Sequence, residues 1–143
     1  MNAYADSSFL LSLYSVDAHS QSAAVLVRQH QPVFCLTPFL EAEFTNAVEL
    51  AVYIKRYTAR EARAVRDYFR SHIRSGVFRI CDFPPDAYPL ARTLSSRHTA
   101  QLGTRTLDVL HVACALAVKA EVFFTFDQRQ ERLARAEGLR LLP

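Results

Sequence analysis

Short apolar runs alternate along this chain with longer segments that have the pattern of helices. The runs at residues 3–6, 33–36, 77–81 and 122–126 have the length and composition of buried strands. At least one helical segment separates each run from the next, and this order is typical of a parallel sheet, because parallel strands need a crossover between them. We therefore predict an α/β fold with a central parallel sheet of four to five strands, the fifth being an edge strand at residues 139–142.

The connecting segments carry clear helix boundaries. Thr37 and Pro38 begin a helix that we expect to continue to about residue 56, because a threonine hydroxyl caps a first turn and proline fits into it. Thr58 and Glu61 have the spacing of a capping box, so the next helix should run to residue 75. Further helices are expected at residues 7–14, 17–31, 84–99, 106–119 and 127–136. The chain thus supplies at least one helix for every crossover.

The composition is that of a soluble globular protein, and the cysteines are consistent with a location in the cytoplasm. Of 143 residues, 50% are hydrophobic and 22% are charged, so we expect residues 1–143 to form a single domain with a proper core. The longest apolar run, near residues 109–118, is too short to span a bilayer, and the N-terminus lacks the basic start of a secretory signal. Cys35, Cys81 and Cys114 lie far apart in apolar stretches, so we expect reduced core thiols.

Four acids stand at positions that folding alone does not readily explain. Asp6 and Asp127 each close an expected strand, Glu43 lies in the helix that begins at Thr37, and Asp108 interrupts the apolar segment LDVLHVACALAV. Burying a carboxylate is costly unless it is paired, protonated or bound to a cation. Sites in open parallel sheets lie at the carboxyl ends of the strands, where distant acids can meet. If the fold gathers these four, their natural purpose is to hold a divalent metal.

Several of these acids also have a purely structural interpretation. Asp6 and Asp127 are suited to cap helices, and Gln130 follows Asp127 at the spacing of a capping box. Such a cap can still leave one carboxylate oxygen for a metal. Glu41 and Glu43 flank the apolar face of their helix at similar angles, so periodicity does not choose between them.

Asp108 is the hardest acid to explain structurally, because its helix is apolar on nearly every side. The favourable interaction of a carboxylate with a helix N-terminus, about 0.3–1 kcal/mol, is smaller than the cost of desolvation. His111 lies one turn later. We expect it to be packed in the buried helix and bonded to a neighbour rather than to act as a ligand.

The mild net charge of +3 is unevenly distributed. Seven lysines and arginines lie between Lys55 and Arg74, against Glu61 and Asp67. Five arginines fall within about a third of the helix circumference, and we call them the arginine stripe: Arg60, Arg63, Arg66, Arg70 and Arg74. Such a stripe suits the phosphate backbone of a nucleic acid, and a solvated helix face is the equal alternative.

The segments around the four acids match a known pattern. YADSSFLLSLY, LTPFLEAEFTNAVELA, LGTRTLDVLHVACAL and FFTFDQRQERLARAEGL follow one another over nearly the whole chain. In this order they resemble the acidic motifs of the PIN-domain family of metal-dependent ribonucleases, specifically the VapC-like toxins of bacterial type II toxin–antitoxin systems. The family pattern places Phe44, Asn46 and Ala47 after the second acid and thereby selects Glu43 over Glu41.

The resemblance implies a three-layer α/β/α fold in which the acids converge at the carboxyl edge of the strands. It implies that Mg²⁺ or Mn²⁺ is held by the four catalytic acids Asp6, Glu43, Asp108 and Asp127. Ser8 and Thr125 are the supporting hydroxyls in this scheme. The implied partners are an RNA substrate, a second copy of the chain and a small cognate antitoxin protein that blocks the groove.

Other functions remain as alternatives. A phosphoryl-transfer α/β domain needs a paired acid at the first strand and a lysine near the end of a late strand, but Lys119 stands at a helix end. Within the PIN family, the alternatives are a nuclease for housekeeping RNA processing and a non-catalytic scaffold that binds RNA or a partner. The intact set of acids favours an endoribonuclease in which bound Mg²⁺ activates water.

Overall fold

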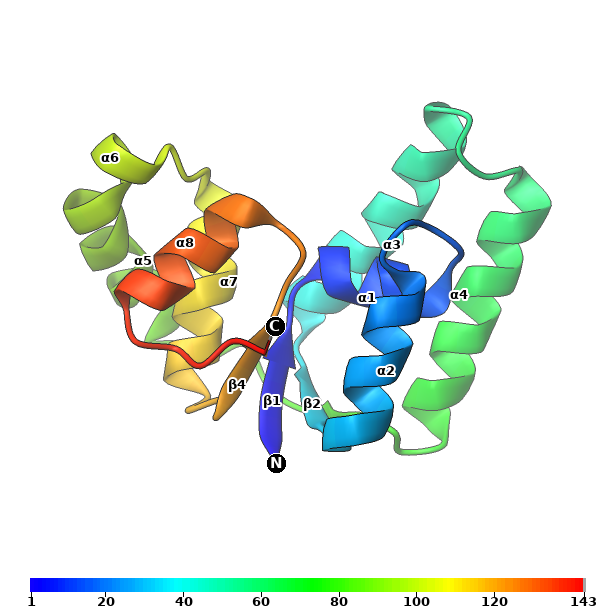
Figure 1. The fold of residues 1–143 in the computed structure, drawn as a ribbon, viewed down its shortest axis with the longest axis horizontal. Helices are drawn as coiled ribbons and strands as arrows, with labels where there is room; N and C mark the ends of the chain where they lie inside the picture. Colours follow the sequence, from blue (N-terminus) through cyan, green and yellow to red (C-terminus); the bar gives the residue numbers. More distant parts are fainter. Residues whose placement is uncertain (143) are drawn as a thin grey trace.

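The structure is a computed structural model that describes residues 1–142, and a sheet of four parallel strands lies at its centre (Figure 1). In spatial order the strands are β3 (Arg79–Ile80), β2 (Val33–Leu36), β1 (Asn2–Ala5) and β4 (Val122–Phe124). Ala3 pairs with Phe34 on one side and with Val122 on the other. The expected fifth strand is reduced to a parallel bridge between Leu141 and Phe123. The prediction of an α/β fold with four to five parallel strands is confirmed.

Two groups of helices lie on opposite sides of the sheet (Figure 1). One group contains α1 (Ser7–Tyr14), α2 (Ser20–His30), α3 (Pro38–Tyr53) and α4 (Ala59–Arg74). The other contains α5 (Ala87–Leu94), α6 (Ala100–Leu102), α7 (Thr106–Ala117) and α8 (Gln128–Ala136), with a π-helical turn at Ser95–Thr99 between α5 and α6. Within residues 1–142, none of these helices combines the length and apolar character needed to cross a membrane.

The order of the strands explains the two helical layers. The chain moves from β1 to β2 and β3 in one direction across the sheet, and the next connection returns past β2 and β1 to reach β4. Crossovers between parallel strands are nearly always right-handed, so connections that run in opposite directions place their helices on opposite faces. The result is the three-layer α/β/α arrangement that the family resemblance implies.

Several elements are shorter than predicted. Helix α2 begins at Ser20 rather than at residue 17, because Asp17 forms a turn in which its carboxylate accepts the N–H of His19. Helix α3 ends at Tyr53, and Lys55 then adopts the left-handed conformation, which breaks the helix. Strand β3 keeps only two residues. It lies at the edge of the sheet and pairs with β2 alone.

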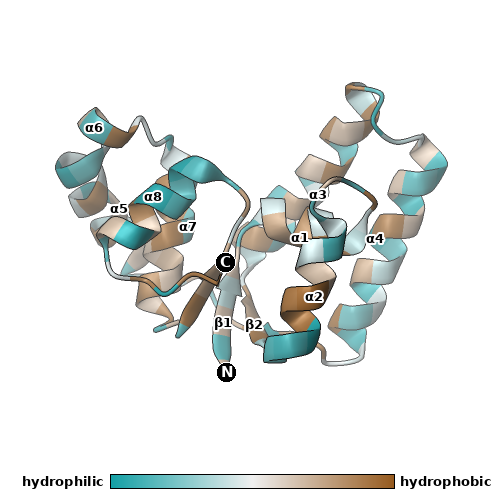
Figure 2. Cartoon of the chain, viewed as in Figure 1, coloured by the Kyte–Doolittle hydropathy of each residue, from teal (hydrophilic) through white to brown (hydrophobic). Residues whose placement is uncertain are grey.

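Aromatic side chains join the sheet to the first helix. Phe9 of α1 is completely buried, and its ring centroid lies 5.9 Å from that of Phe34 and 5.0 Å from that of Phe124. Figure 2 shows hydrophobic residues along β4 and on α2, and hydrophilic residues on outer turns of α4 and α8. Because Phe9 contacts rings from two strands, α1 has a fixed position relative to the ends of the strands.

The expectation of three reduced core thiols is wrong for two of them. The structure joins Cys35 of β2 to Cys81, just beyond β3, in a disulfide with a Cα–Cα distance of 5.9 Å. The parallel pairing of β2 with β3 brings these residues together although they are 46 positions apart in the sequence. Among the described residues Cys114 is the free cysteine, and it is buried as predicted.

Candidate active site

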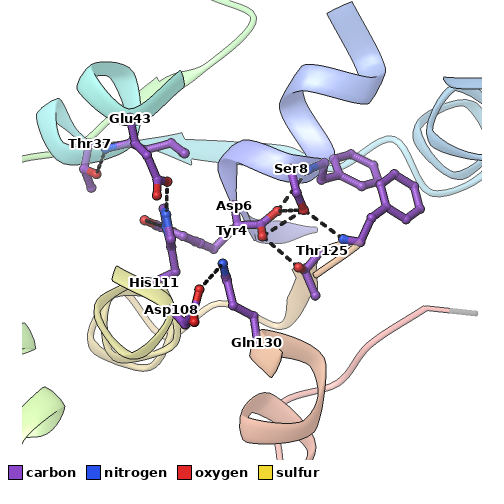
Figure 3. Close-up of polar contacts among 12 residues, drawn as sticks. Tyr4, Asp6, Ser8, Thr37, Glu43, Asp108, His111, Thr125 and Gln130 are labelled. Carbon is purple, nitrogen blue, oxygen red and sulfur yellow. Dashed lines mark hydrogen bonds and ion pairs between the residues drawn. The ribbon is translucent and has the colours of Figure 1, made fainter. Parts of the chain in front are cut away.

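The fold brings the four predicted acids to one cavity. The cavity has a volume of about 450 Å³ and is lined by Asp6, Ser7, Ser8, Glu43, Arg105, Thr106, Leu107, Asp108, Asp127 and Gln130. It lies where β1 and β4 end, and the direction of strand order reverses between these two strands. Ligands of open α/β sheets bind at such a switch point. Figure 3 shows that three of the acids come from separate elements: Asp6 follows β1, Glu43 lies on α3 and Asp108 lies on α7.

Asp6 is the most heavily bonded member of the cavity. It caps α1 by accepting the N–H of Phe9 at 2.9 Å, and it accepts the hydroxyls of Ser8 and Thr125, each at 2.7 Å. Its side chain is completely buried. Burial raises the pKa of Asp6 above its ordinary value, although the attraction of His111 and these hydrogen bonds act to lower it. The capping role and a place in the cavity therefore coexist.

Ser8 and Thr125 orient their hydroxyl protons toward Asp6. The hydroxyl oxygen of Ser8 accepts the N–H of Phe126 at 3.0 Å, and that of Thr125 accepts the N–H of Asp127 at 2.9 Å. Because each oxygen already accepts a backbone donor, its own proton is available for the carboxylate. The two hydroxyls thus connect the end of β4 to Asp6, which is the supporting position that the family resemblance implies for them.

Glu43 is held by a buried hydrogen-bonded pair. The Nε2 of His111 donates to the carboxylate of Glu43, and the Nδ1 of His111 lies 3.1 Å from the hydroxyl of Tyr4 (Figure 3). Burial raises the pKa of Tyr4, so its phenol stays protonated beside Nδ1 of His111. Burial also acts to raise the pKa of Glu43, but the hydrogen bond and charge of His111 outweigh it and lower that pKa.

These contacts separate Glu43 from Glu41. Glu43 lines the cavity, whereas Glu41 is exposed to solvent and is not among the lining residues. The structure therefore places Glu43, which the family pattern selects, in the cavity and Glu41 outside it, and the catalytic role of Glu43 stays a prediction. His111 is buried and bonded to a neighbour as expected, and that neighbour is an acid of the cavity.

Asp108 lies in the first turn of α7, with 8% of its side chain exposed. Its Oδ2 accepts the backbone N–H of Arg105 at 2.9 Å, and its Oδ1 lies 3.5 Å from Nε2 of Gln130. Thr106 is the first residue of the helix rather than its cap. Arg105 and Gln130 were not predicted as part of the site, and Arg105 brings a positive charge to the exposed rim of the cavity.

Asp127 caps α8, as its structural interpretation predicted. Its Oδ1 accepts the N–H groups of Arg129 at 2.8 Å and of Gln130 at 3.1 Å. The reciprocal half of a capping box is absent, since the N–H of Asp127 is bonded to Thr125 instead. Among residues 1–142, Oδ2 of Asp127 takes part in none of the hydrogen bonds, so this oxygen remains available within the cavity.

The chemistry of the cavity suits a hard divalent cation. Four carboxylates supply oxygen donors, which Mg²⁺ and Mn²⁺ prefer, and a bound cation relieves their mutual repulsion. Within the part of the chain that the structure describes, however, no three histidine, cysteine or acidic side chains are already close enough to hold an ion together. Each acid is instead held by its own donors. The four carboxylates are nevertheless the type of ligand that Mg²⁺ or Mn²⁺ prefers.

The arginine stripe lies outside this cavity. Helix α4 buries Ala62, Val65 and Phe69 and leaves four of the five arginines exposed, and it lies at the outer edge of its helical group (Figure 1). Arg66 forms an ion pair with Glu49 of α3. The residues that line the cavity include none of the stripe. Contact between the stripe and RNA stays a prediction.

Comparison with known proteins identifies the family. The model of the PIN domain matches residues 3–136, and the chain therefore belongs to the PIN-domain family. A solved structure with a similar fold is that of VapBC2 from Rickettsia felis, which is bound to a DNA fragment from the VapBC2 promoter. It has a TM-score of 0.69 and 17% sequence identity, with 99% of this chain and 98% of that chain covered.

Two further solved structures share the fold. VapC20 from Mycobacterium tuberculosis, a toxin that cleaves the sarcin–ricin loop, has a TM-score of 0.68 and 20% identity over 91% of this chain and 93% of its own. PAE2754 from Pyrobaculum aerophilum has a TM-score of 0.59 and 19% identity over 99% of this chain and 83% of its own. No match was found among curated proteins. At these identities the structural likeness shows the fold.

Proposed function

We propose that this chain is a metal-dependent endoribonuclease and the toxin of a toxin–antitoxin pair. The observation that carries the proposal is the convergence of four carboxylates, from four separate segments of the chain, on one cavity. Membership of the PIN-domain family supports nuclease activity. The similarity in fold to VapC20, a sarcin–ricin loop cleaving toxin, supports RNA as the substrate and a toxin as the biological role.

In this proposal Asp6 and Asp108 are the principal ligands of Mg²⁺ or Mn²⁺, and Glu43 and Asp127 complete the site or position water. A cation held there would activate water for attack and would offset the negative charge that develops at the phosphodiester. The protein holds the carboxylate oxygens of these acids in one cavity before the cation binds.

The neighbours of the acids hold these donors in place. The hydroxyls of Ser8 and Thr125 orient Asp6, and His111 orients Glu43. Arg105 at the rim offers a positive charge to the phosphate that enters. These residues fix the positions of the acids and supply a positive charge near the phosphate. The hydrolysis needs no covalent intermediate with the protein.

The partners of the protein follow from the same proposal. The fold is similar to that of VapBC2, which was solved on promoter DNA, and this likeness supports a cognate antitoxin that blocks the acid cavity. We further propose a homodimer that acts on RNA in the cytoplasm. A small reading frame found immediately upstream of this gene would encode the candidate antitoxin, and co-expression with it, followed by purification of the complex, tests the assignment.

Removal of the metal tests the proposed activity. Purified protein should cleave RNA in Mg²⁺, and EDTA should lower the cleavage rate by at least about 100-fold, because a metal contributes several kcal/mol to such a reaction. Added Mn²⁺ should restore cleavage, while circular dichroism shows that the protein stays folded in EDTA. Equal cleavage with and without EDTA would rule out the metal. Failure to cleave RNA under either condition would favour the alternative function, a non-catalytic scaffold that binds RNA or a partner.

The arginine stripe makes a separate prediction. Replacing Arg63 and Arg70 with alanine should weaken RNA binding and reduce the slope of log affinity against log salt by about 1.4, since each contact with single-stranded RNA contributes about 0.7. Titrations at several salt concentrations measure the slope. Replacing Arg28 and Arg92, which are also exposed, removes the same charge elsewhere and should leave the slope nearly unchanged. If both double variants show the same slope, the stripe does not bind RNA and is an ordinary solvated helix face.

A further inference from the structure

Gln130 is a buried polar side chain within the acid cavity. It lies in the first turn of α8 with 5% of its surface exposed, and it lines the same cavity as the four acids. Its Nε2 lies 3.5 Å from Oδ1 of Asp108 (Figure 3). Among the buried side-chain nitrogen and oxygen atoms of residues 1–142, its Oε1 is the one without a hydrogen-bond partner. Buried polar atoms are nearly always bonded, so this oxygen calls for a donor.

The local structure explains why this side chain points into the cavity. A glutamine at this position of a helix ordinarily reaches back to the backbone N–H of the capping residue. Here that N–H, of Asp127, is taken by the hydroxyl of Thr125. The amide of Gln130 is thereby released from capping and lies beside Asp108. An apolar side chain at this buried position avoids the cost of an unbonded oxygen, so folding alone does not explain the glutamine.

The surroundings limit which donor can satisfy the oxygen. Four of the residues that line the cavity with Gln130 are carboxylates, which accept hydrogen bonds and do not donate them when ionised, and none of the hydroxyl and guanidinium donors in the lining bonds to its Oε1. Arg105, the cationic side chain of the cavity, is close to Asp108. The water molecules around a divalent cation are strong donors, and Mg²⁺ usually keeps several of them. Because an amide oxygen is neutral, it accepts such a bond without adding to the repulsion among the acids.

We propose that Gln130 is a positioning residue of the acid cavity: its Nε2 orients Asp108, and its Oε1 accepts a hydrogen bond from water held by the divalent cation. This inference rests on the proposed function, because it requires a cation in the cavity. It adds a neutral member to the four acids and assigns it a role in affinity for the metal.

Replacing Gln130 with methionine tests the inference, because methionine has a similar length and no hydrogen-bonding amide. The Kd for Mn²⁺, measured from the electron paramagnetic resonance signal of free Mn²⁺, should rise about 10- to 100-fold, as is typical when a group that supports metal ligands is lost. Without metal, the melting temperature should be unchanged or higher, because an unbonded buried oxygen has been removed. Gln130→Glu restores an oxygen acceptor and should bind Mn²⁺ more tightly than Gln130→Met.

The matched control is Gln128→Met, which makes the same change at an exposed position of the same helix. It should leave both the Kd and the melting temperature unchanged. A purely structural role for Gln130 predicts the opposite pattern: the methionine variant then loses stability, or fails to fold, and binds Mn²⁺ with the affinity of the wild type when folded. A methionine variant that is less stable than the wild type, or one that binds Mn²⁺ with wild-type affinity, overturns the inference. A glutamate variant that binds Mn²⁺ no better than the methionine variant also overturns it.

The two proposals fail in different ways. If the wild-type protein binds Mn²⁺ and the Gln130→Met variant binds it equally well, the role of Gln130 is wrong and the proposed function stands. If the wild-type protein itself does not bind Mn²⁺, both are wrong.

Discussion

Replacing Asp108 with asparagine should lower the rate of RNA cleavage by at least about 1,000-fold while leaving the protein folded, since loss of a metal ligand removes several kcal/mol of stabilisation from the transition state. Asparagine has the size of aspartate, and its oxygen can still accept the N–H of Arg105. The variant thus loses the negative charge but keeps the bond in the first turn of α7. Single-turnover cleavage of RNA in Mg²⁺ measures the rate, and thermal unfolding measures the fold.

Two glutamates on one helix provide a matched control for this result. Glu43→Gln removes a charge that lines the cavity, and Glu41→Gln removes one that is exposed to solvent. Cleavage should fall strongly in the first variant and remain at the level of the wild type in the second. An Asp108→Asn variant with full activity contradicts the assigned site. Equal loss of activity in the two glutamate variants points instead to a general effect of charge on RNA binding.

The largest loss of stability should come from Phe9→Ala, which is expected to lower the free energy of unfolding by about 3–5 kcal/mol. The side chain is completely buried against Phe34, Phe124 and Phe126, so its removal leaves a cavity between α1 and the sheet. Urea unfolding without metal measures the change. Activity should fall as well, because the N–H of Phe9 bonds to Asp6 and the helix carries Ser8.

Two variants control for this prediction. Phe9→Leu keeps most of the buried surface and should cost less than Phe9→Ala. Tyr53→Ala removes an aromatic ring that is 83% exposed and should change stability by no more than about 0.5 kcal/mol. If Phe9→Ala costs less than about 1 kcal/mol, the ring does not hold α1 on the sheet as the structure indicates.

The fold was largely predictable because its signals are local. Short apolar runs, hydroxyl caps such as Thr37 and the alternation of strand and helix lie within a few residues of one another. Contacts between distant segments were not predictable in the same way. The pairing of β2 with β3, which joins Cys35 to Cys81, depends on how the sheet assembles, and no local spacing in the sequence indicates it.

Membership of the candidate site was predictable where burial makes an acid costly, and less predictable where the packing of distant segments decides which residue faces the cavity. Asp108 stands out in an apolar helix, but Glu41 and Glu43 differ only in which of them meets His111 from α7. Gln130 had the signal of a helix cap, and its place in the cavity depends on a bond from Asp127 to Thr125 that a sequence pattern does not show. Residues of this kind are found only once distant segments are placed together.

The most direct test of the central claim follows bound Mn²⁺ and RNA cleavage in the same samples. For the wild type, we expect the cleavage rate to rise in proportion to the fraction of protein with bound Mn²⁺. The Asp108→Asn variant should bind Mn²⁺ at least about tenfold more weakly and should remain inactive at every Mn²⁺ concentration at which the wild type cleaves. Cleavage at full rate by wild-type protein without bound Mn²⁺, or equal binding and cleavage by the two proteins, would contradict the account.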